Sequence, residues 1–363
     1  MHIHCTKKLL DQLKIKPEQV DEGAPLTSWH ANFLTINRKK TLVLVNDQNR
    51  YVIVLHGLKA KDFKKLDENI LHSIRITFEQ EGIKNDVIEQ FIHSSEAFAY
   101  SKTKDRKLVA RLNKACEMLT VFQELLDPES IDQTALNMRI SRLFVGDGKK
   151  DYFKPNEKLY EDLEALAGTP IIQTKGIEMK VTLRLSNFNV YRKLVVPMNF
   201  SFHQLHDALQ IAFNWKHNHL HAFYIFDHKN DGAVHKPILN LVCNQEALSF
   251  GNDAIPMKMD TQIKLADYAP ATITYIYDFG DDWVHDIEMG RVIEDYDKNY
   301  PICLEGEGKT PPEDVGGEGG YEHFLKILAD KDHPDYEHMQ SWSGGLSYQD
   351  FDMERINRRL ENM

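Results

Sequence analysis

The sequence contains little cysteine, with four thiols among 363 residues and no two of them close together. Because no C-x-x-C pair occurs, the spacing argues against both a disulfide framework and a thiolate zinc site. We therefore expect reduced, structural thiols at Cys5, Cys116, Cys243 and Cys303.

Long apolar runs are also missing. The longest aliphatic stretches, Leu42 to Val45 and Val52 to Leu55, are far shorter than the roughly 20 residues that span a bilayer. The start of the chain carries charge at Lys7 and Lys8 and lacks a secretory apolar region with a small-residue cleavage site. We therefore expect a cytoplasmic protein with no membrane partner.

Charge of one sign dominates only part of the chain, whose formal net charge is -11. Residues 1–120 carry 20 basic and 15 acidic side chains, whereas residues 176–363 carry 17 and 30. A surface as acidic as the second one repels phosphates, so nucleic-acid binding by the C-terminal half is disfavoured.

Basic residues crowd the start of one expected helix in the N-terminal half. They could contact nucleic-acid phosphates. A solvated helix face explains the same pattern, and we favour it because the excess of basic residues is small. Both interpretations apply to Lys104, Arg106, Lys107 and Arg111.

The length predicts two domains at about 100 to 200 residues per domain, and 42% hydrophobic residues are typical of a globular protein. Segments broken by Pro128, Pro155 and Gly168 follow the first set of strands and helices. We expect an α+β domain at 1–126, a linker and helical connection at 127–175, and a second α+β domain at 176–363.

In the first domain, strands precede helices. Strand patterns cover His2 to Cys5, Trp29 to Ile36, Thr41 to Val45 and Tyr51 to Leu55. Helical spacing follows at Lys61 to Glu81, Asp86 to Phe91 and Arg106 to Leu125.

In the second domain, apolar residues alternate cleanly from Ile177 to Leu185, which predicts a half-buried strand. A second strand from Val190 to Val196, a helix with a capping box at Ser201 and Gln204, and a late hairpin follow. The hairpin joins Thr272–Phe279 to Trp283–Val292, and a loop from Cys303 to Gly320 comes after it. We expect each domain to be a mainly antiparallel sheet with helices on one face, the second compatible with a β-grasp-like sheet.

Several strings of the second half resemble the plasmid pRiA-type ORF-three-like family, found on plasmids and as accessory proteins beside transposases. They are Arg192-Lys193-Leu194-Val195-Val196-Pro197, Phe213-Asn214-Trp215, His219-Leu220-His221, Tyr277-Asp278-Phe279-Gly280-Asp281-Asp282-Trp283-Val284-His285, Pro311-Pro312-Glu313-Asp314 and Asn357-Arg358-Arg359-Leu360. Near the fifth string the family tends to carry cysteines, where this chain has Thr310 and Val315, so the resemblance implies no thiolate metal site here. Three strings lie in the first 120 residues: Cys5-Thr6-Lys7-Lys8-Leu9-Leu10, Trp29-x-Ala31-Asn32 and Thr103-Lys104-x-Arg106-x-Leu108. With them this half looks like a bacterial domain of unknown function that sometimes precedes this family.

The densest polar cluster lies at the tip of the expected hairpin and in the acidic loop after it. A Gly-Asp-Asp turn accounts for two adjacent carboxylates, which also exceed what a turn requires. Strand alternation places one histidine on an apolar face, where a core histidine bonded to backbone is the simpler interpretation. The candidate ligand-binding residues are Asp281, Asp282, Trp283, His285, Glu313 and Asp314.

Histidines precede and enter the strand that begins near His221. Because residues two apart in a strand share a face, His219 and His221 could ligate one metal ion, although nothing supplies an obvious third ligand. Asp281 and Asp282 complete the candidate metal set. No cofactor is indicated apart from a divalent cation at these residues.

The favoured function is therefore a non-catalytic accessory protein of mobile-element type, whose second domain binds a protein or a small ligand through the acidic turn and loop. The first alternative is a metal-assisted hydrolase or nuclease that uses the clustered Asp, His and Glu residues. The second is nucleic-acid association through the basic helix of the first domain.

Overall fold

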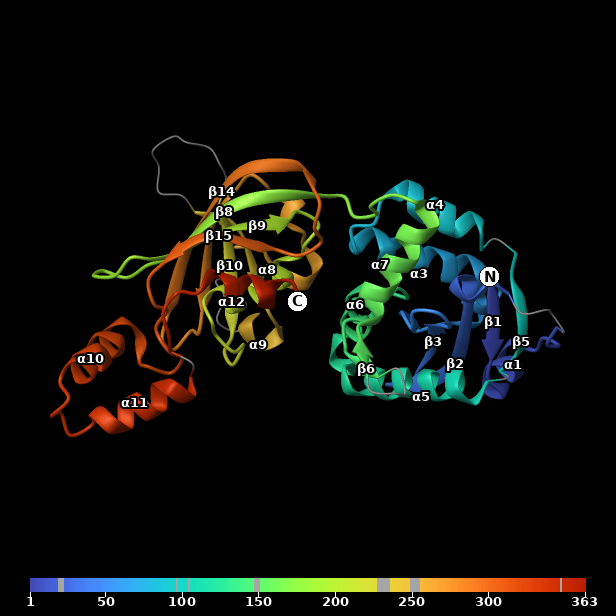
Figure 1. Ribbon diagram of the computed structural model, residues 1–363, viewed down its shortest axis with the longest axis horizontal. Helices are drawn as coiled ribbons and strands as arrows, with labels where there is room; N and C mark the ends of the chain where they lie inside the picture. The colour runs from blue at the N-terminus through green and yellow to red at the C-terminus, as the bar shows by residue number, and fades with distance from the viewer. Residues whose placement is uncertain are drawn as a thin grey trace. The chain divides into compact units, whose positions relative to one another are not determined.

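A computed structural model describes residues 1–18, 23–95, 97–103, 105–146, 151–226, 236–248, 255–346 and 348–363. The chain forms two compact units, Met1–Gln173 and Thr174–Met363 (Figure 1). Both units mix helices and strands, which confirms two α+β domains. No helix in the described ranges combines the length and the apolar character needed to cross a bilayer.

The first unit contains a five-stranded mixed sheet in the order β4-β3-β2-β1-β5. The expected antiparallel meander is present in β2, β3 and β4, whereas β1 runs parallel to both of its neighbours. The strands are β1 (His2–Cys5), β2 (Ser28–Ile36), β3 (Lys39–Asn46), β4 (Val52–His56) and β5 (Ala99–Lys102). A separate two-stranded ribbon joins β6 (Val145–Gly146) and β7 (Tyr152–Phe153).

Helices cover both faces of this sheet rather than one (Figure 1). Leu42 and Leu44 of β3 pack with α3, α4 and α7, whereas Val43 and Val45 pack with α5 and α6. Because both alternating sets of β3 are apolar, each face of the sheet must be removed from water. The helices are α1 (Lys7–Leu13), α2 (Ala60–Phe63), α3 (Leu66–Gln80), α4 (Asn85–His93), α5 (Arg106–Val121), α6 (Thr134–Ser141) and α7 (Pro155–Ala167).

The expected linker and helical connection at 127–175 contains helices, but residues up to Gln173 belong to the first unit and do not link two domains. Helices α6 and α7 place Leu136, Ile140, Leu159 and Leu163 in the core of the first unit, each at most 4% exposed. The change of unit falls between Gln173 and Thr174, two residues before the expected start of the second domain.

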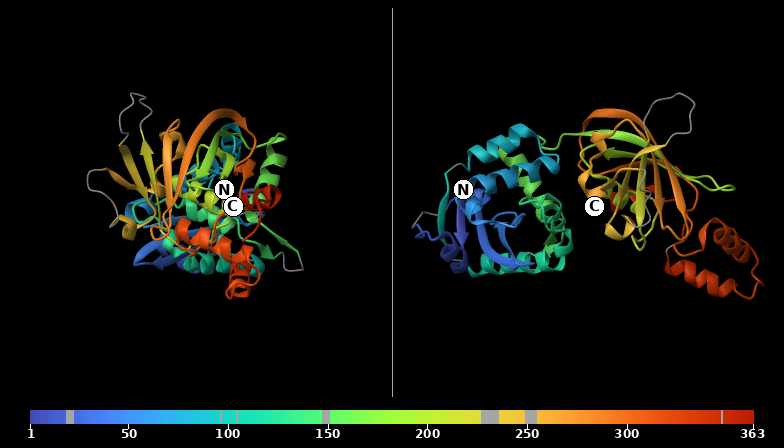
Figure 2. Two further views of the ribbon diagram at one scale, coloured as in Figure 1. Left: turned by 90° about the vertical axis from the view of Figure 1, so that its left-hand side faces the viewer. Right: turned by 180° about the vertical axis from the view of Figure 1, so that it is seen from behind.

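The second unit contains an eight-stranded sheet in the order β12-β11-β10-β13-β14-β8-β9-β15 (Figures 1 and 2). Its pairs are antiparallel except for β11 with β12. The strands are β8 (Thr174–Leu183), β9 (Val190–Pro197), β10 (His221–Phe226), β11 (Pro237–Val242), β12 (Met257–Met259), β13 (Thr272–Tyr277), β14 (Trp283–Tyr296) and β15 (Ile302–Glu307). The expected loop from Cys303 to Gly320 thus begins with an edge strand.

Helix α8 (Phe202–Ala212) follows the hairpin of β8 and β9, as expected, and starts with the capping box of Ser201 and Gln204. Its residues Phe202, Leu205 and Leu209 are fully buried in the main core of the unit. The β-grasp-like order is present only in part, because the strand beside β8 is the antiparallel β14. The remaining helices are α9 (Gln245–Leu248), α10 (Gly317–Ala329), α11 (Tyr336–Gly345) and α12 (Met353–Leu360).

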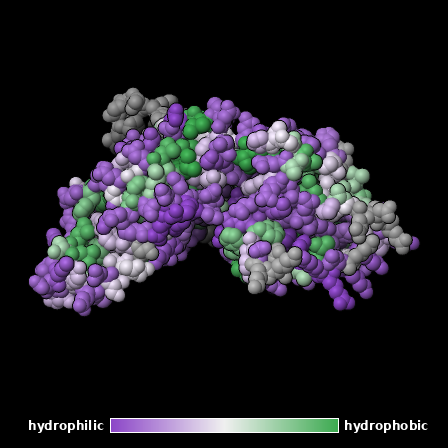
Figure 3. All heavy atoms as spheres, in the orientation of Figure 1, coloured by the Kyte–Doolittle hydropathy of each residue, from purple (hydrophilic) through white to green (hydrophobic). Residues whose placement is uncertain are grey.

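Apolar side chains reach the surface mainly in small groups on the face seen in Figure 3. Four clusters of buried apolar side chains occur among the described residues, and each lies wholly within one unit. Each unit therefore has hydrophobic cores of its own.

Candidate functional site

The acidic turn between β13 and β14 is held by its own hydrogen bonds. Asp278 Oδ1 accepts from the backbone N–H groups of Gly280 at 2.9 Å and Asp281 at 3.3 Å. Asp278 and Asp282 both have φ of 57°, a conformation that aspartate tolerates better than most residues. The turn geometry therefore explains these carboxylates without a ligand.

The acidic loop approaches this turn, as its sequence position allows. Asp281 Oδ2 accepts from the backbone N–H of Gly316 at 3.1 Å. His219 Nε2 lies 3.5 Å from Asp278 Oδ2 and 3.1 Å from Asp314 Oδ1. Asp314 is largely exposed, and these three side chains are close enough to share a cation.

Glu313 is buried and fastens the loop to the sheet. Its Oε1 accepts from the hydroxyl of Tyr277 at 2.5 Å and from the backbone N–H of Lys216 at 3.0 Å. Its Oε2 accepts from Asn218 Nδ2 at 3.2 Å. Burial and the adjacent carboxylate raise the pKa of Tyr277, which stays a hydrogen-bond donor. Glu313 thus has a structural role that its position in an acidic loop did not reveal.

Trp283 and His285, two further candidates, lie in the hydrophobic core. His285 is completely buried, and its Nδ1 lies 3.1 Å from the carbonyl oxygen of Trp283. Its ring contacts Phe213, Trp215 and Tyr275. The core interpretation of His285 is correct, and neither side chain can reach a ligand at the surface.

The burial of His285 predicts a pH dependence of stability. Burial lowers its pKa to about 3, whereas an unfolded histidine titrates near 6.5. Below pH 6.5 His285 is protonated in the unfolded state but stays neutral in the folded state. The free energy of unfolding should therefore fall by about 1.4 kcal/mol for each pH unit. Urea unfolding at pH 6.5 and 5, followed by tryptophan fluorescence, should show about 2 kcal/mol less loss in His285→Gln than in wild type. Equal losses would contradict this assignment.

His219 and His221 do not converge on one metal ion. His219 precedes β10, which begins at His221, so the two-residue alternation of a strand does not extend to it. The Nε2 atom of His221 instead lies 2.8 Å from Oδ2 of Asp260. The predicted shared metal site is therefore wrong, and each histidine belongs to a different cluster.

The second of these clusters joins α8, β10 and the short 3₁₀ turn Asp260–Gln262. His203 Nδ1 lies 3.3 Å from the same Asp260 Oδ2 that His221 contacts. Asp260 is 0% exposed, and its Oδ1 has no hydrogen-bond partner in the described part of the chain. His203 keeps more than a third of its side chain exposed, so the cluster opens to solvent on that side.

Electrostatics separate the two imidazoles. Burial opposes the charged form of His203, but the bond to Asp260 and the negative charges of Asp207 and Asp260 together outweigh burial and raise the pKa of His203 to about 9. Burial lowers the pKa of His221 despite the same carboxylate. Asp260 is held ionised because hydrogen bonds from both imidazoles lower its pKa against the effect of burial. At neutral pH the cluster therefore contains one ion pair and one neutral imidazole.

A hydrogen-bonded chain runs beside this cluster. Gln210 Nε2 donates to the hydroxyl of Tyr275 at 3.2 Å, and that hydroxyl lies 2.7 Å from His206 Nδ1. His206 Nε2 in turn lies 3.1 Å from His217 Nδ1, and the His206 ring stacks on His221 at 3.5 Å between centroids. Both nitrogens of His206 have partners in this series of hydrogen bonds. Its ring therefore has a structural role, which is to pack against the ring of His221.

Sequence reasoning missed His203, His206, Asp260 and Tyr275 as parts of a site. The spacing His203-x-x-His206 on one helix and three nearby histidines was the available signal. Asp260 lies 39 residues from His221 and gave no signal at all.

The basic residues of the first unit remain a candidate nucleic-acid contact that the fold does not test. Arg106 and Lys107 are exposed at the start of α5, whereas Arg111 Nη1 donates to the backbone carbonyl of Asp47 at 3.2 Å. Lys104 lies outside the described residues.

Comparison with known proteins matches residues 175–360 to the family described as plasmid pRiA4b ORF-3-like protein, which is about half of the chain. The chain belongs to this family. Residues 2–158 match a second family, described as domain of unknown function DUF6933. The resemblances of both halves are thus confirmed.

One curated protein and one solved structure are similar to this chain over part of its length. "Uncharacterized protein y4hQ" of Sinorhizobium fredii is 32% identical over 173 residues, which are 47% of this chain and 82% of that protein. A crystal structure of a protein of unknown function, MM3350 from Methanosarcina mazei, covers 50% of this chain and 97% of its own at 28% identity and a TM-score of 0.42. Only the y4hQ comparison adds to the family assignment.

Proposed function

We propose that the ORF-3-like unit is a metal-binding domain, in which His203, His221 and Asp260 bind a transition-metal ion of the zinc class. Imidazole nitrogens and a carboxylate are the ligands that such ions take in proteins. The observation that carries the proposal is the carboxylate of Asp260, which is fully buried between two imidazoles with one oxygen unpartnered among the described residues.

The distances support the same assignment. Ligands about 2.0–2.1 Å from a tetrahedral ion lie roughly 3.3 Å from one another. His203 Nδ1 and Asp260 Oδ2 are 3.3 Å apart, and the three ligand atoms of the cluster all lie within 4.8 Å of one another. The 2.8 Å contact of His221 needs only a small movement of one side chain.

Three protein ligands with an open side are the composition of catalytic rather than closed structural zinc sites. The partly exposed ring of His203 leaves the solvent side for water or a bound group. An ion there would polarise that group, which is the chemistry of the metal-assisted alternative with different residues. The acidic turn and loop are weaker candidates, because Asp278, Asp281 and Glu313 already accept hydrogen bonds within the unit.

The test is titration of the untagged full chain with Zn²⁺ and Co²⁺ by calorimetry and visible absorption. We expect one ion per chain and cobalt bands of a four- or five-coordinate site. His203→Ala, at a partly exposed position, should weaken binding more than the 10- to 100-fold that is roughly typical of losing an outer-shell partner. Asp260→Asn should do the same, provided that its circular dichroism is unchanged.

Two variants serve as controls. His338→Ala removes an exposed histidine of the same unit and should leave binding unchanged. His219→Ala tests the neighbouring cluster of Asp278 and Asp314. Loss of binding in His219→Ala with retention in His203→Ala, or no binding by wild type, overturns the proposal.

A further inference from the structure

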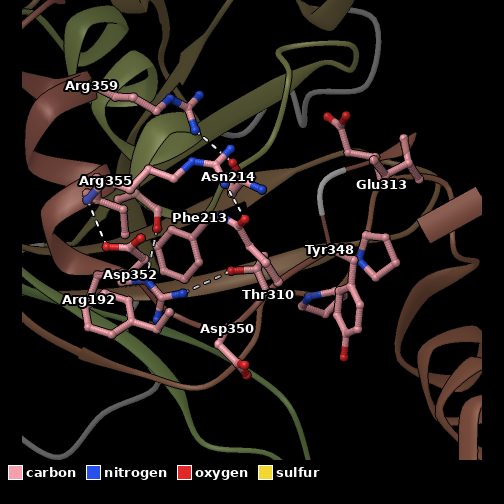
Figure 4. A pocket seen from close by; sticks show the side chains of 17 residues that line it. Arg192, Phe213, Asn214, Thr310, Glu313, Tyr348, Asp350, Asp352, Arg355 and Arg359 are labelled. Carbon is pink, nitrogen blue, oxygen red and sulfur yellow. Dashed lines mark hydrogen bonds between the residues drawn. The ribbon is translucent and has the colours of Figure 1, made fainter. Parts of the chain in front are cut away.

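A pocket on the opposite end of α8 from His203 gathers three arginines (Figure 4). Arg355 and Arg359 come from one face of α12, four residues apart, and extend toward Asn214 (Figure 4). Arg192 of β9 lies in the same pocket, with its guanidinium between the rings of Phe213 and Phe351. We call this group of residues the arginine pocket.

The guanidinium groups of the arginine pocket have neutral partners. Arg355 Nη1 donates to the amide oxygen of Gln349, and Arg359 Nη1 donates to Asn214 Oδ1 at 2.8 Å. Arg192 donates only to carbonyl and hydroxyl oxygens. None of the three forms an ion pair with a carboxylate of the described ranges.

The carboxylates that also line the pocket are engaged elsewhere. Asp350 lies 3.1 Å from Lys309 Nζ and is largely exposed. Asp352 Oδ1 caps α12 by accepting from the backbone N–H of Arg355 at 2.9 Å. Glu313 accepts three hydrogen bonds, from Lys216, Asn218 and Tyr277.

Arg355 and Arg359 repel one another across one helical turn. Burial and the charge of Arg355 lower the pKa of Arg359, so its cation is held at a cost. An anion between the two groups would remove this cost, and the planar fork of arginine fits phosphate oxygens in pairs.

We propose that the arginine pocket binds a phosphate monoester group, with Arg355 and Arg359 as the principal donors. The lining of the pocket balances three arginines with three carboxylates, and the half of the chain around it carries 17 basic and 30 acidic residues, so a long polyanion would be repelled there. A single phosphate group on a small molecule can pair with Arg355 and Arg359, and it carries too little charge to be repelled strongly by the acidic surroundings. This site is independent of the metal cluster, since it shares no residue with it.

The experiment is calorimetric titration of the full chain with inorganic phosphate and with phenyl phosphate in buffer of fixed ionic strength. We expect binding that Arg355→Gln and Arg359→Gln each weaken at least about tenfold, or about 1.4 kcal/mol. Arg358→Gln, on the exposed side of the same helix and near Glu354, is the matched control and should bind as wild type does. Thermal unfolding of each variant reports whether the unit is still folded.

The two probes distinguish the sources of phosphate. If phenyl phosphate binds more tightly than inorganic phosphate, the organic group of the ligand contacts the aromatic side chains of Tyr348 and Phe351, which line the pocket. Equal affinity assigns the site to the free anion. No binding of either probe, an equal loss in Arg358→Gln, or binding of single-stranded DNA in their place overturns the proposal.

Discussion

Glu81→Ala is expected to destabilise the first unit by about 3–5 kcal/mol, the cost of breaking a buried ion pair. Glu81 is completely buried, and Arg142 donates to both of its carboxylate oxygens, at 2.9 and 2.7 Å. The hydroxyls of Tyr51 at 2.6 Å and Tyr160 at 2.7 Å donate to the same carboxylate. The variant would leave a buried cation without a counter-ion and two hydroxyl groups without their acceptor.

Chemical denaturation of the variant measures this loss. Glu81→Gln keeps the size and one acceptor oxygen, so it should lose less than Glu81→Ala. Glu89→Ala is the control, because Glu89 pairs with Arg75 at a partly exposed site where such pairs contribute about 0–1 kcal/mol. A loss in Glu81→Ala no larger than that of the control would show that the cluster does not hold the unit together.

Arg192→Lys should destabilise the second unit by about 2–4 kcal/mol although it preserves the charge. Arg192 is 2% exposed, and its guanidinium joins three segments through five hydrogen bonds. Its acceptors are the carbonyl oxygens of Tyr191, Ala212, Glu307 and Gly308 and the hydroxyl of Thr310. Lysine has three donors, so at least two buried acceptors lose their partner, at about 1–3 kcal/mol each.

Burial already lowers the pKa of Arg192 to about 10, so a lysine there would meet the same unfavourable surroundings with fewer hydrogen bonds. Arg184→Lys is the matched control in the neighbouring strand region, since the Arg184 pair with Asp286 is exposed. Differential scanning calorimetry should show a lower midpoint temperature of unfolding for Arg192→Lys but not for Arg184→Lys. Equal transitions for the two variants would exclude the proposed role of the guanidinium fork.

Elements specified by neighbouring residues were predictable from the sequence. The capping box of Ser201 and Gln204 starts α8 where expected, and the hairpin of β13 and β14 turns at the Gly-Asp-Asp sequence. Both signals act within a few residues, where local hydrogen bonds and alternation determine the backbone.

The proline and glycine residues of 127–175 were interpreted as breaks between domains. Two of them instead mark the two ends of a helix within the first unit. Pro155 occupies the first turn of α7, where a missing N–H costs nothing, and Gly168 ends it with φ of 69°. Strand β15 was missed for another reason. Its Glu305 and Glu307 are charged, which is typical of an edge strand and resembles a loop.

The metal cluster could not be predicted, because its carboxylate joins the histidines only through tertiary structure. Asp260 is 57 residues from His203, and no local pattern connects them. Gln210 illustrates the same limit, since the glutamine side chain is mostly exposed in proteins. It is fully buried because Tyr275 and the backbone N–H of His217 satisfy its amide.

The separation of the hydrophobic clusters into two units has a consequence for synthesis of the chain. Among the described residues, each hydrophobic cluster takes its members from one unit alone. At about 5–20 residues per second, translation of the second unit takes roughly 10–40 s. The first unit can therefore bury both faces of its sheet during this interval, before the strands of the second unit have been synthesised. Strands of the two units then have little opportunity to pair with one another.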